Sequence, residues 1–247
     1  MRAVLLALPC AKGDLTSNLQ HHLAALADAQ ELRADLAVFP EFSLTGSVDP
    51  ARHPDDAVTL DHPAVTALVA ATTSVAAVFG VAERLADGFA ITQVAAADGR
   101  VVAVPRKRRL GEGEEGYQPG TATAVFTIAG RRCGLVICAE AGVDHTWDDC
   151  ASAGAEVILF CSAPGLYGRR RDDDGWRAGL AWWESCGLTD ARRHAARLGV
   201  PVLMATQSGS AHDEDFPGLA ARVSASGEVL DRTPDWRPGR LVVDVAP

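Results

Sequence analysis

Short apolar runs recur along the chain and are separated by amphipathic stretches and turns. The runs show no alternation of apolar and polar positions, as in strands that are covered on both faces. They occupy residues 3–8, 36–39, 76–82, 125–128, 134–137, 157–161 and 202–205. We expect a buried strand at each of them.

Helices are predicted between these strands, because leucine and alanine recur there at helical intervals. The first has Ser17 and Gln20 at the spacing of a capping box. The last is followed by Gly199, which suits a left-handed cap. The predicted helices cover a segment that ends near residue 31, residues 64–71, residues 147–153 and a long segment that ends near Leu198.

Turn signals join other strands into hairpins. Asp98–Gly99 is a strong hairpin signal, Ala129–Gly130 marks another turn, and a last hairpin at 221–231 is closed by a strand at 241–245. Helix-separated strands mixed with hairpins predict mixed sheets that are covered by helices. We therefore expect an α/β fold with two sheets in a sandwich, as a single domain over residues 1–247.

Composition narrows the classes of partner. The 247 residues are 48% hydrophobic and carry a formal net charge of −9, so nucleic acid and anionic membrane surfaces are not expected partners, and a small neutral or cationic substrate fits more easily. No apolar run approaches the ~18 residues of a membrane span. The six cysteines include no CxxC pair, and we expect a protein of the cytoplasm with reduced thiols.

Three reactive side chains directly follow apolar strands. Glu41 follows the proline that ends the strand at 36–39, where partial desolvation would raise its pKa towards that of a general base. Cys138 follows the strand at 134–137, and a thiol attacks as its thiolate, which needs a neighbouring base or cation. Lys107 lies in the basic run PRKRR. Taken one at a time, these residues also fit an exposed loop acid, a core cysteine and a solvated basic face.

Together the three stretches resemble the nitrilase-like carbon–nitrogen hydrolases. The signatures of that superfamily are Pro-Glu followed by Thr-Gly, then Lys-x-x-Leu, then Gly-x-x-Ile-Cys-x-Asp/Glu. This chain contains FPEFSLTG, RKRRL and GLVICAE in the same order, and GDLTSNLQ, VILFCSAP and DFPGLAARVSASGEVLD resemble further parts of the family. The resemblance covers nearly the whole chain.

The resemblance implies a catalytic set. Glu41 would act as general base, Cys138 as nucleophile, and Lys107 with the backbone N–H of Ala139 as stabilisers of the oxyanion. A second glutamate follows the lysine by eight residues in some relatives, which indicates Glu115. Two other acids of the GEGEEG loop, Glu112 and Glu114, remain alternatives because the register of this loop is open.

The resemblance also implies an activity and an assembly. We expect an amidase that acts on a small linear amide, for example an ω-amide of a dicarboxylic acid, through a cysteine thioester and without metal or organic cofactor. An N-carbamoyl amide hydrolase and a catalytically silent binding protein of the same fold are the alternatives. The helical face is expected to pack against a second copy in a homodimer with four αββα–αββα layers.

Two charged clusters need separate interpretation. In the loop GLYGRRRDDDGW, one of Arg169, Arg170 and Arg171 could meet a substrate carboxylate, although the neighbouring aspartates also fit a solvated turn that neutralises itself. The acids of GVDHTWDDC lie at the start of a predicted helix, where they favour the helix dipole, and we do not expect them to bind a metal.

Overall fold

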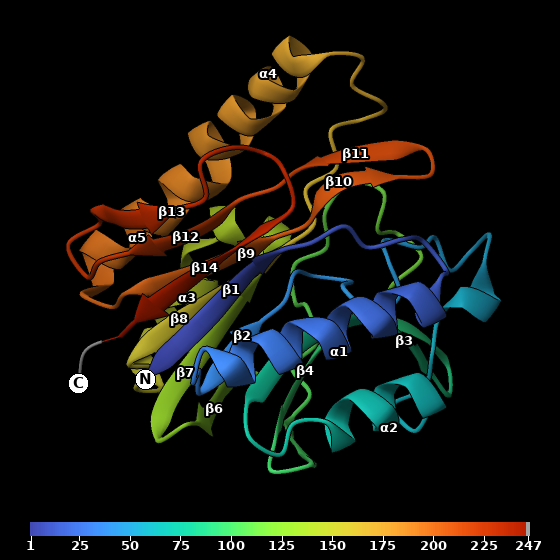
Figure 1. The fold of residues 1–247 in the computed structure, drawn as a ribbon, viewed down its shortest axis with the longest axis horizontal. Coiled ribbons are helices and arrows are strands. Elements are labelled where there is room, and N and C mark those ends of the chain that lie inside the picture. Colours follow the sequence, from blue (N-terminus) through green and yellow to red (C-terminus); the bar gives the residue numbers. More distant parts are fainter. Residues whose placement is uncertain (246–247) are drawn as a thin grey trace.

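Two six-stranded sheets pack face to face in the computed structural model, which describes residues 1–245 (Figure 1). The first sheet has the order β14-β1-β2-β3-β4-β5. Its strands are β1 (Arg2–Ala7), β2 (Leu36–Val38), β3 (Ala76–Leu85), β4 (Gly88–Ala97), β5 (Arg100–Ala103) and β14 (Gly239–Asp244).

The second sheet has the order β13-β12-β9-β8-β7-β6. Its strands are β6 (Val125–Ile128), β7 (Arg131–Ile137), β8 (Val157–Ser162), β9 (Val202–Thr206), β12 (Ala220–Val223) and β13 (Val229–Arg232). In each sheet three parallel strands are followed by two antiparallel ones, and one further antiparallel strand lies on the opposite edge. The two halves of the sandwich therefore repeat one arrangement of strands.

Helices cover the outer face of each sheet. The first sheet is covered by α1 (Leu15–Glu31) and α2 (Pro63–Ala70), and the second by α3 (Asp144–Ser152), α4 (Asp173–Trp183) and α5 (Thr189–Leu198). The predicted α/β sandwich with αββα layers is confirmed.

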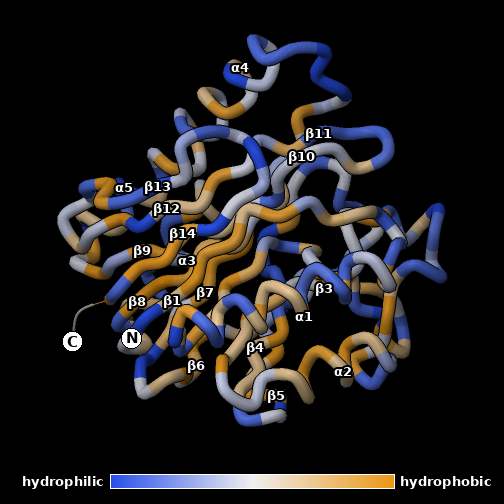
Figure 2. Tube along the Cα trace, in the orientation of Figure 1, coloured by the Kyte–Doolittle hydropathy of each residue, from blue (hydrophilic) through white to orange (hydrophobic). Residues whose placement is uncertain are grey.

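Three apolar clusters hold the layers together. The central one lies between the sheets and includes Leu5, Val38, Leu135 and Leu159, all at most 1% exposed. The other two lie between each sheet and its helices. Figure 2 shows the same distribution, with the most hydrophobic segments in the strands and polar segments in the outer loops. The strands are buried on both faces, which explains why apolar and polar positions do not alternate along them.

Three local features differ from the sequence-based expectations. Helix α1 is capped by Asp14, whose side chain accepts a hydrogen bond from the Ser17 N–H, and not by a capping box of Ser17 and Gln20. The long helix before Gly199 is interrupted by a π-helical turn (Glu184–Leu188), which separates α4 from α5. A hairpin of β10 (Ser208–Ala211) and β11 (Glu214–Pro217) was not predicted and forms a third, two-stranded sheet beside the loop that leads to α4.

Candidate active site

Glu41 lies in a tight turn directly after β2. Its side chain is fully buried, and the next residue, Phe42, has a positive φ of 54°. The turn lies against Gly80 of β3, where a Cβ atom would come within 2.3 Å of the Phe42 nitrogen. The Gly80 N–H donates to Ser43 Oγ at 3.0 Å, and the Leu44 N–H donates to the Gly80 carbonyl at 2.9 Å. The missing side chain of Gly80 thus allows the turn to lie on the sheet and to direct Glu41 into the interior.

Lys107 follows β5 and is held in place by backbone hydrogen bonds. Its N–H donates to the Ile91 carbonyl at 2.8 Å, and its own carbonyl accepts from the Gly120 N–H at 2.7 Å. The side chain is fully buried. A buried lysine needs carboxylate partners if it is to keep its charge.

Cys138 directly follows β7 and begins a short 3-10 helix, Cys138–Gly142. Its φ of 41° lies in the left-handed region, which is a strained backbone conformation for a residue with a side chain. Ala139 is the second residue of this helical turn, so its N–H has no partner within the turn. The chain therefore presents a thiol and a backbone donor at the same place.

The three side chains meet between the ends of the two sheets. The Lys107 Nζ lies 2.8 Å from Glu41 Oε1, and the Cys138 thiol lies close enough to both groups that their charges act on its pKa. The Ala163 N–H, directly after β8, donates to Glu41 Oε2 at 3.1 Å and also faces the Cys138 sulfur. The expected grouping of Glu41, Lys107 and Cys138 is present in the structure.

Burial and charge set the protonation states of this cluster. Burial, opposed by the Lys107 charge, raises the pKa of Glu41 to about 7. Burial, together with the negative charge of Glu41, raises the pKa of the Cys138 thiol well above its usual value. Burial alone would lower the pKa of Lys107, but Glu41, Cys138 and Glu114 outweigh it and hold the pKa above its usual range. The resting cluster thus contains a charged lysine, a neutral thiol and a carboxyl group that titrates near neutrality.

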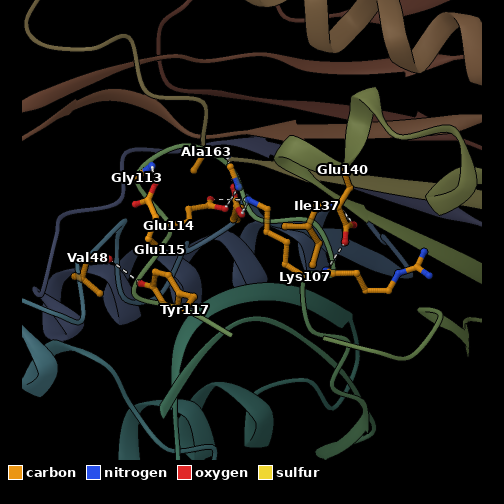
Figure 3. A network of polar contacts seen from close by, with 12 residues as sticks. Val48, Lys107, Gly113, Glu114, Glu115, Tyr117, Ile137, Glu140 and Ala163 are labelled. Carbon is orange, nitrogen blue, oxygen red and sulfur yellow. Dashed lines mark hydrogen bonds and ion pairs between the residues drawn. The ribbon is translucent and has the colours of Figure 1, made fainter. Parts of the chain in front are cut away.

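Glu114 is the acid of the GEGEEG loop that contacts Lys107, and the expectation that Glu115 meets Lys107 is wrong. Glu114 Oε1 lies 2.6 Å from Lys107 Nζ, and Glu114 Oε2 accepts from the Gly111 N–H at 2.5 Å (Figure 3). Glu115 is exposed and accepts from the Gly113 N–H at 3.2 Å. A turn through Gly113, with φ of 82°, sets this register. Glu112 is exposed and makes no contact with Lys107 in the described structure.

No role was predicted for Glu140, which is buried beside the cluster. Its Oε1 accepts from the Arg108 N–H at 2.6 Å and its Oε2 from the Ile137 N–H at 2.9 Å (Figure 3). Glu140 therefore ties the residue after Lys107 to the residue before Cys138. The acidic last position of the Gly-x-x-Ile-Cys-x-Asp/Glu signature was the available signal for this role.

A cavity of about 370 Å³ opens over the cluster. Its lining includes Glu114 and Ala163, which hydrogen-bond Lys107 and Glu41 respectively, and Phe42, which follows Glu41. This volume is near the lower limit for small-molecule sites in proteins. The site is therefore suited to a small substrate.

The two charged clusters have structural partners. Arg169 pairs with Asp215 at 3.1 Å and donates to the His212 carbonyl, while Arg170 donates to the Leu166 carbonyl. Arg169 and Arg170 are thus held by residues other than the neighbouring aspartates, and none of the three arginines lines the cavity over the cluster.

The acids around α3 are each held by an arginine. Asp144 lies 2.9 Å from Arg193, Asp148 lies 2.5 Å from Arg197, and Asp149 lies 2.6 Å from Arg108. The first two pairs tie α3 to α5, and the third ties α3 to the residue after Lys107.

An αββα sandwich with a buried lysine and glutamate beside a partly exposed cysteine defines the nitrilase-like fold class. The sequence model of carbon-nitrogen hydrolases matches residues 3–247. The chain belongs to this family.

Solved structures share the fold over the whole chain. The amidase from Nesterenkonia sp. AN1 is 24% identical, with a TM-score of 0.82, and the match covers 100% of this chain and 93% of that one. A mutant of that amidase, in which the acetamide moiety of fluoroacetamide is added covalently at the active site cysteine, is 23% identical, with a TM-score of 0.82 and coverage of 99% and 90%. A glutamine-dependent NAD+ synthetase from Acinetobacter baumannii is 18% identical, with a TM-score of 0.82, and the match covers 100% of this chain and 48% of that one.

Proposed function

We propose that the protein hydrolyses the C–N bond of a small linear amide, with release of ammonia and a carboxylic acid. The observation that carries this proposal is the contact of one buried ammonium, Lys107, with both Glu41 and Glu114 beside the Cys138 thiol. A purely structural cluster has no need of a thiol on a strained backbone, next to residues such as Glu114 and Ala163 that line a cavity.

The first half of the reaction forms a thioester. Glu41 takes the thiol proton as the Cys138 sulfur attacks the amide carbon, and the carbonyl oxygen becomes an oxyanion. Lys107 and the Ala139 N–H stabilise that charge, and removal of one such donor typically costs about 3 kcal/mol of transition-state stabilisation. Glu41 then gives its proton to the leaving nitrogen, and ammonia departs.

The second half returns the enzyme to its starting state. Glu41 takes a proton from water, the hydroxide attacks the thioester carbon, and the Cys138 thiolate leaves and recovers the proton. Glu114 holds Lys107 in place and offers a carboxylate oxygen to the substrate amide N–H. None of these steps uses a metal or an organic cofactor.

The alternatives differ in what the pocket accepts. An N-carbamoyl amide hydrolase would use the same four residues, and a silent binding protein would use none of them. The contacts among Glu41, Lys107 and Cys138 favour a hydrolase. We further propose that the enzyme acts in the cytoplasm, in agreement with its six free cysteines.

The test is ammonia release from a panel of amides, N-carbamoyl amines and nitriles, combined with mass spectrometry of the protein. We expect Cys138→Ser to lose at least about 10³-fold in kcat, since the thioester step depends on the sulfur. The matched control is Cys186→Ser, because Cys186 is the other partly exposed cysteine and donates to the Trp182 carbonyl rather than to Glu41, Lys107 or Glu114. Trapped acyl groups should be found on Cys138 and not on Cys186. Full ammonia release after alkylation of Cys138 would refute the proposal.

A further inference from the structure

Four of the residues that line the cavity over the cluster are acids. Asp49, Glu112 and Glu214 line it together with Glu114, and Lys12 is the cation among its lining residues, all of which lie in the described structure. These residues come from three loops and from the β10–β11 hairpin. The negative lining is therefore built by segments that are far apart in the sequence.

Several of these charges already have partners. Glu114 pairs with Lys107, and Asp49 lies 3.3 Å from Arg52. Lys12 lies 2.8 Å from Asp213, outside the cavity lining, and 3.7 Å from Glu214. The lysine is thus shared by two carboxylates, and the cavity keeps an excess of negative charge near Glu112 and Glu214.

The hairpin residue Glu214 is directed into the cavity wall by a glycine. At Gly165, which also lines the cavity, a Cβ atom would come within 2.0 Å of Glu214 Oε1. The Glu214 side chain is 23% exposed and accepts from the Tyr167 N–H at 3.3 Å. This carboxylate is held at the wall and remains reachable from the cavity.

Tyr167 adds an aromatic ring next to the two acids. It is 74% exposed, has a positive φ of 54°, and lines the cavity. Burial and the negative charge of Glu112 both raise the pKa of its hydroxyl, which places the ring near that carboxylate. Carboxylates beside the face of an aromatic ring are the combination that binds organic ammonium groups in proteins.

We propose that the substrate of this site is an amide that carries a positively charged amino group, held by Glu112, Glu214 and Tyr167 while its amide carbon meets Cys138. This inference rests on the proposed amidase function and specifies its substrate class. It replaces the expectation of an ω-amide of a dicarboxylic acid. A substrate carboxylate would face the acids of this wall, whereas Arg169 and Arg170 are bound elsewhere.

The experiment compares three amides of equal chain length that differ in the charge of the far end: 5-aminopentanamide, pentanamide and glutaramate. We expect kcat/KM to be about tenfold or more higher for 5-aminopentanamide than for pentanamide, and lowest for glutaramate. Glu112→Gln and Glu214→Gln should each reduce the ratio between the first two amides. Raising the salt concentration to about 0.5 M should reduce it as well, because exposed charges are screened.

Glu31→Gln is the matched control, since it removes the same charge at the far end of α1, 17 residues long, or about 25 Å from the end near Lys12. It should leave the ratio unchanged. A ratio near one, or a ratio that neither cavity variant changes, would overturn the inference while leaving the amidase proposal intact.

Failure of the amidase proposal has a different signature. If none of the three amides is hydrolysed, binding to Cys138→Ala is measured by calorimetry with the same compounds. Tighter binding of 5-aminopentanamide than of pentanamide then supports the cationic site independently of turnover. Equal or weaker binding refutes it.

Discussion

Lys107 keeps its charge in the interior because two carboxylates contact it. A buried ammonium paired with one carboxylate has no net charge. Lys107 contacts two carboxylates, Glu41 and Glu114, so the three groups together carry a net negative charge when both acids are ionised. The cluster relieves this excess when Glu41 is protonated, which fits its raised pKa of about 7. The negative charge of Glu114 therefore contributes, after burial, to the raised pKa of Glu41.

The neighbouring acids Glu114 and Glu115 allow a test with a built-in control. Glu114→Gln removes a charged contact to Lys107, and we expect kcat/KM to fall by about 10² or more. Glu115→Gln alters an exposed side chain that contacts the Gly113 N–H, and we expect a change within about twofold. The measurement is steady-state kinetics on the best amide. Similar losses in both variants would contradict the assigned register.

The pKa of Glu41 predicts how activity depends on pH. Burial raises this pKa to about 7, so at pH 6 most Glu41 is protonated and cannot accept the thiol proton. We therefore expect kcat/KM to rise about tenfold per unit of pH below 7 and to level off above it. The pH profile of iodoacetamide alkylation at Cys138 should follow the same curve. A flat profile between pH 5 and 8 would show that another group is the base.

The sequence predicted three of the four central residues and missed the fourth for a physical reason. Glu41, Lys107 and Cys138 follow apolar strands, which fix their positions. The fourth residue, Glu114, lies in GEGEEG, where glycines adopt conformations that no hydrophobic pattern encodes. Spacing alone could not distinguish Glu114 from Glu115.

At the scale of elements, the turn after β2 is the part of the site with least room for change. Its backbone lies on β3, and the contact depends on Gly80. The 3-10 turn at Cys138 is fixed in a different way, by the two backbone bonds that Glu140 accepts. Close packing fixes the position of Glu41, and hydrogen bonds fix the position of Cys138.

Gly80→Ala tests this close packing. The new methyl group would meet the Phe42 nitrogen at 2.3 Å and the Glu41 carbonyl carbon at 2.9 Å, so the turn must move. We expect a loss of about 1–3 kcal/mol in the free energy of unfolding, measured in urea, and a lower kcat. Gly239→Ala is the control, because its new methyl group would meet its nearest neighbour, the Arg237 carbonyl oxygen, at an ordinary distance of 3.8 Å. Equal stability of the two variants would contradict the packing argument.

Elements were predicted where burial leaves a clear pattern. The apolar runs located the central strands, because these strands are buried on both faces. The β10–β11 hairpin escaped prediction since Ser208–Ala211 and Glu214–Pro217 consist largely of residues with low strand propensity. The π-helical turn was missed because it continues a helical pattern with one residue more per turn.

At the scale of the whole molecule, we predict a homodimer in which the helical face packs against a second copy. Sedimentation equilibrium at micromolar concentration should give twice the monomer mass of 25.9 kDa. Dilution should shift the population towards the monomer according to mass action. A constant monomer mass over the accessible range of concentration would exclude this assembly.

None of the helices within residues 1–245 combines the length and the apolar composition that a membrane-spanning helix requires.

The edge strand β14 has a consequence for the order in which the chain folds during synthesis. It pairs with β1 along its whole length, and the Met1 amino group and the Val245 carbonyl are 3.1 Å apart. The other five strands of that sheet lie within the first 103 residues, whereas β14 begins at Gly239. While the ribosome makes the second sheet, β1 therefore presents an unpaired edge that can recruit strands of other nascent chains. Docking of β14 closes this edge, so the aggregation risk of this protein is concentrated in the interval before its last strand emerges.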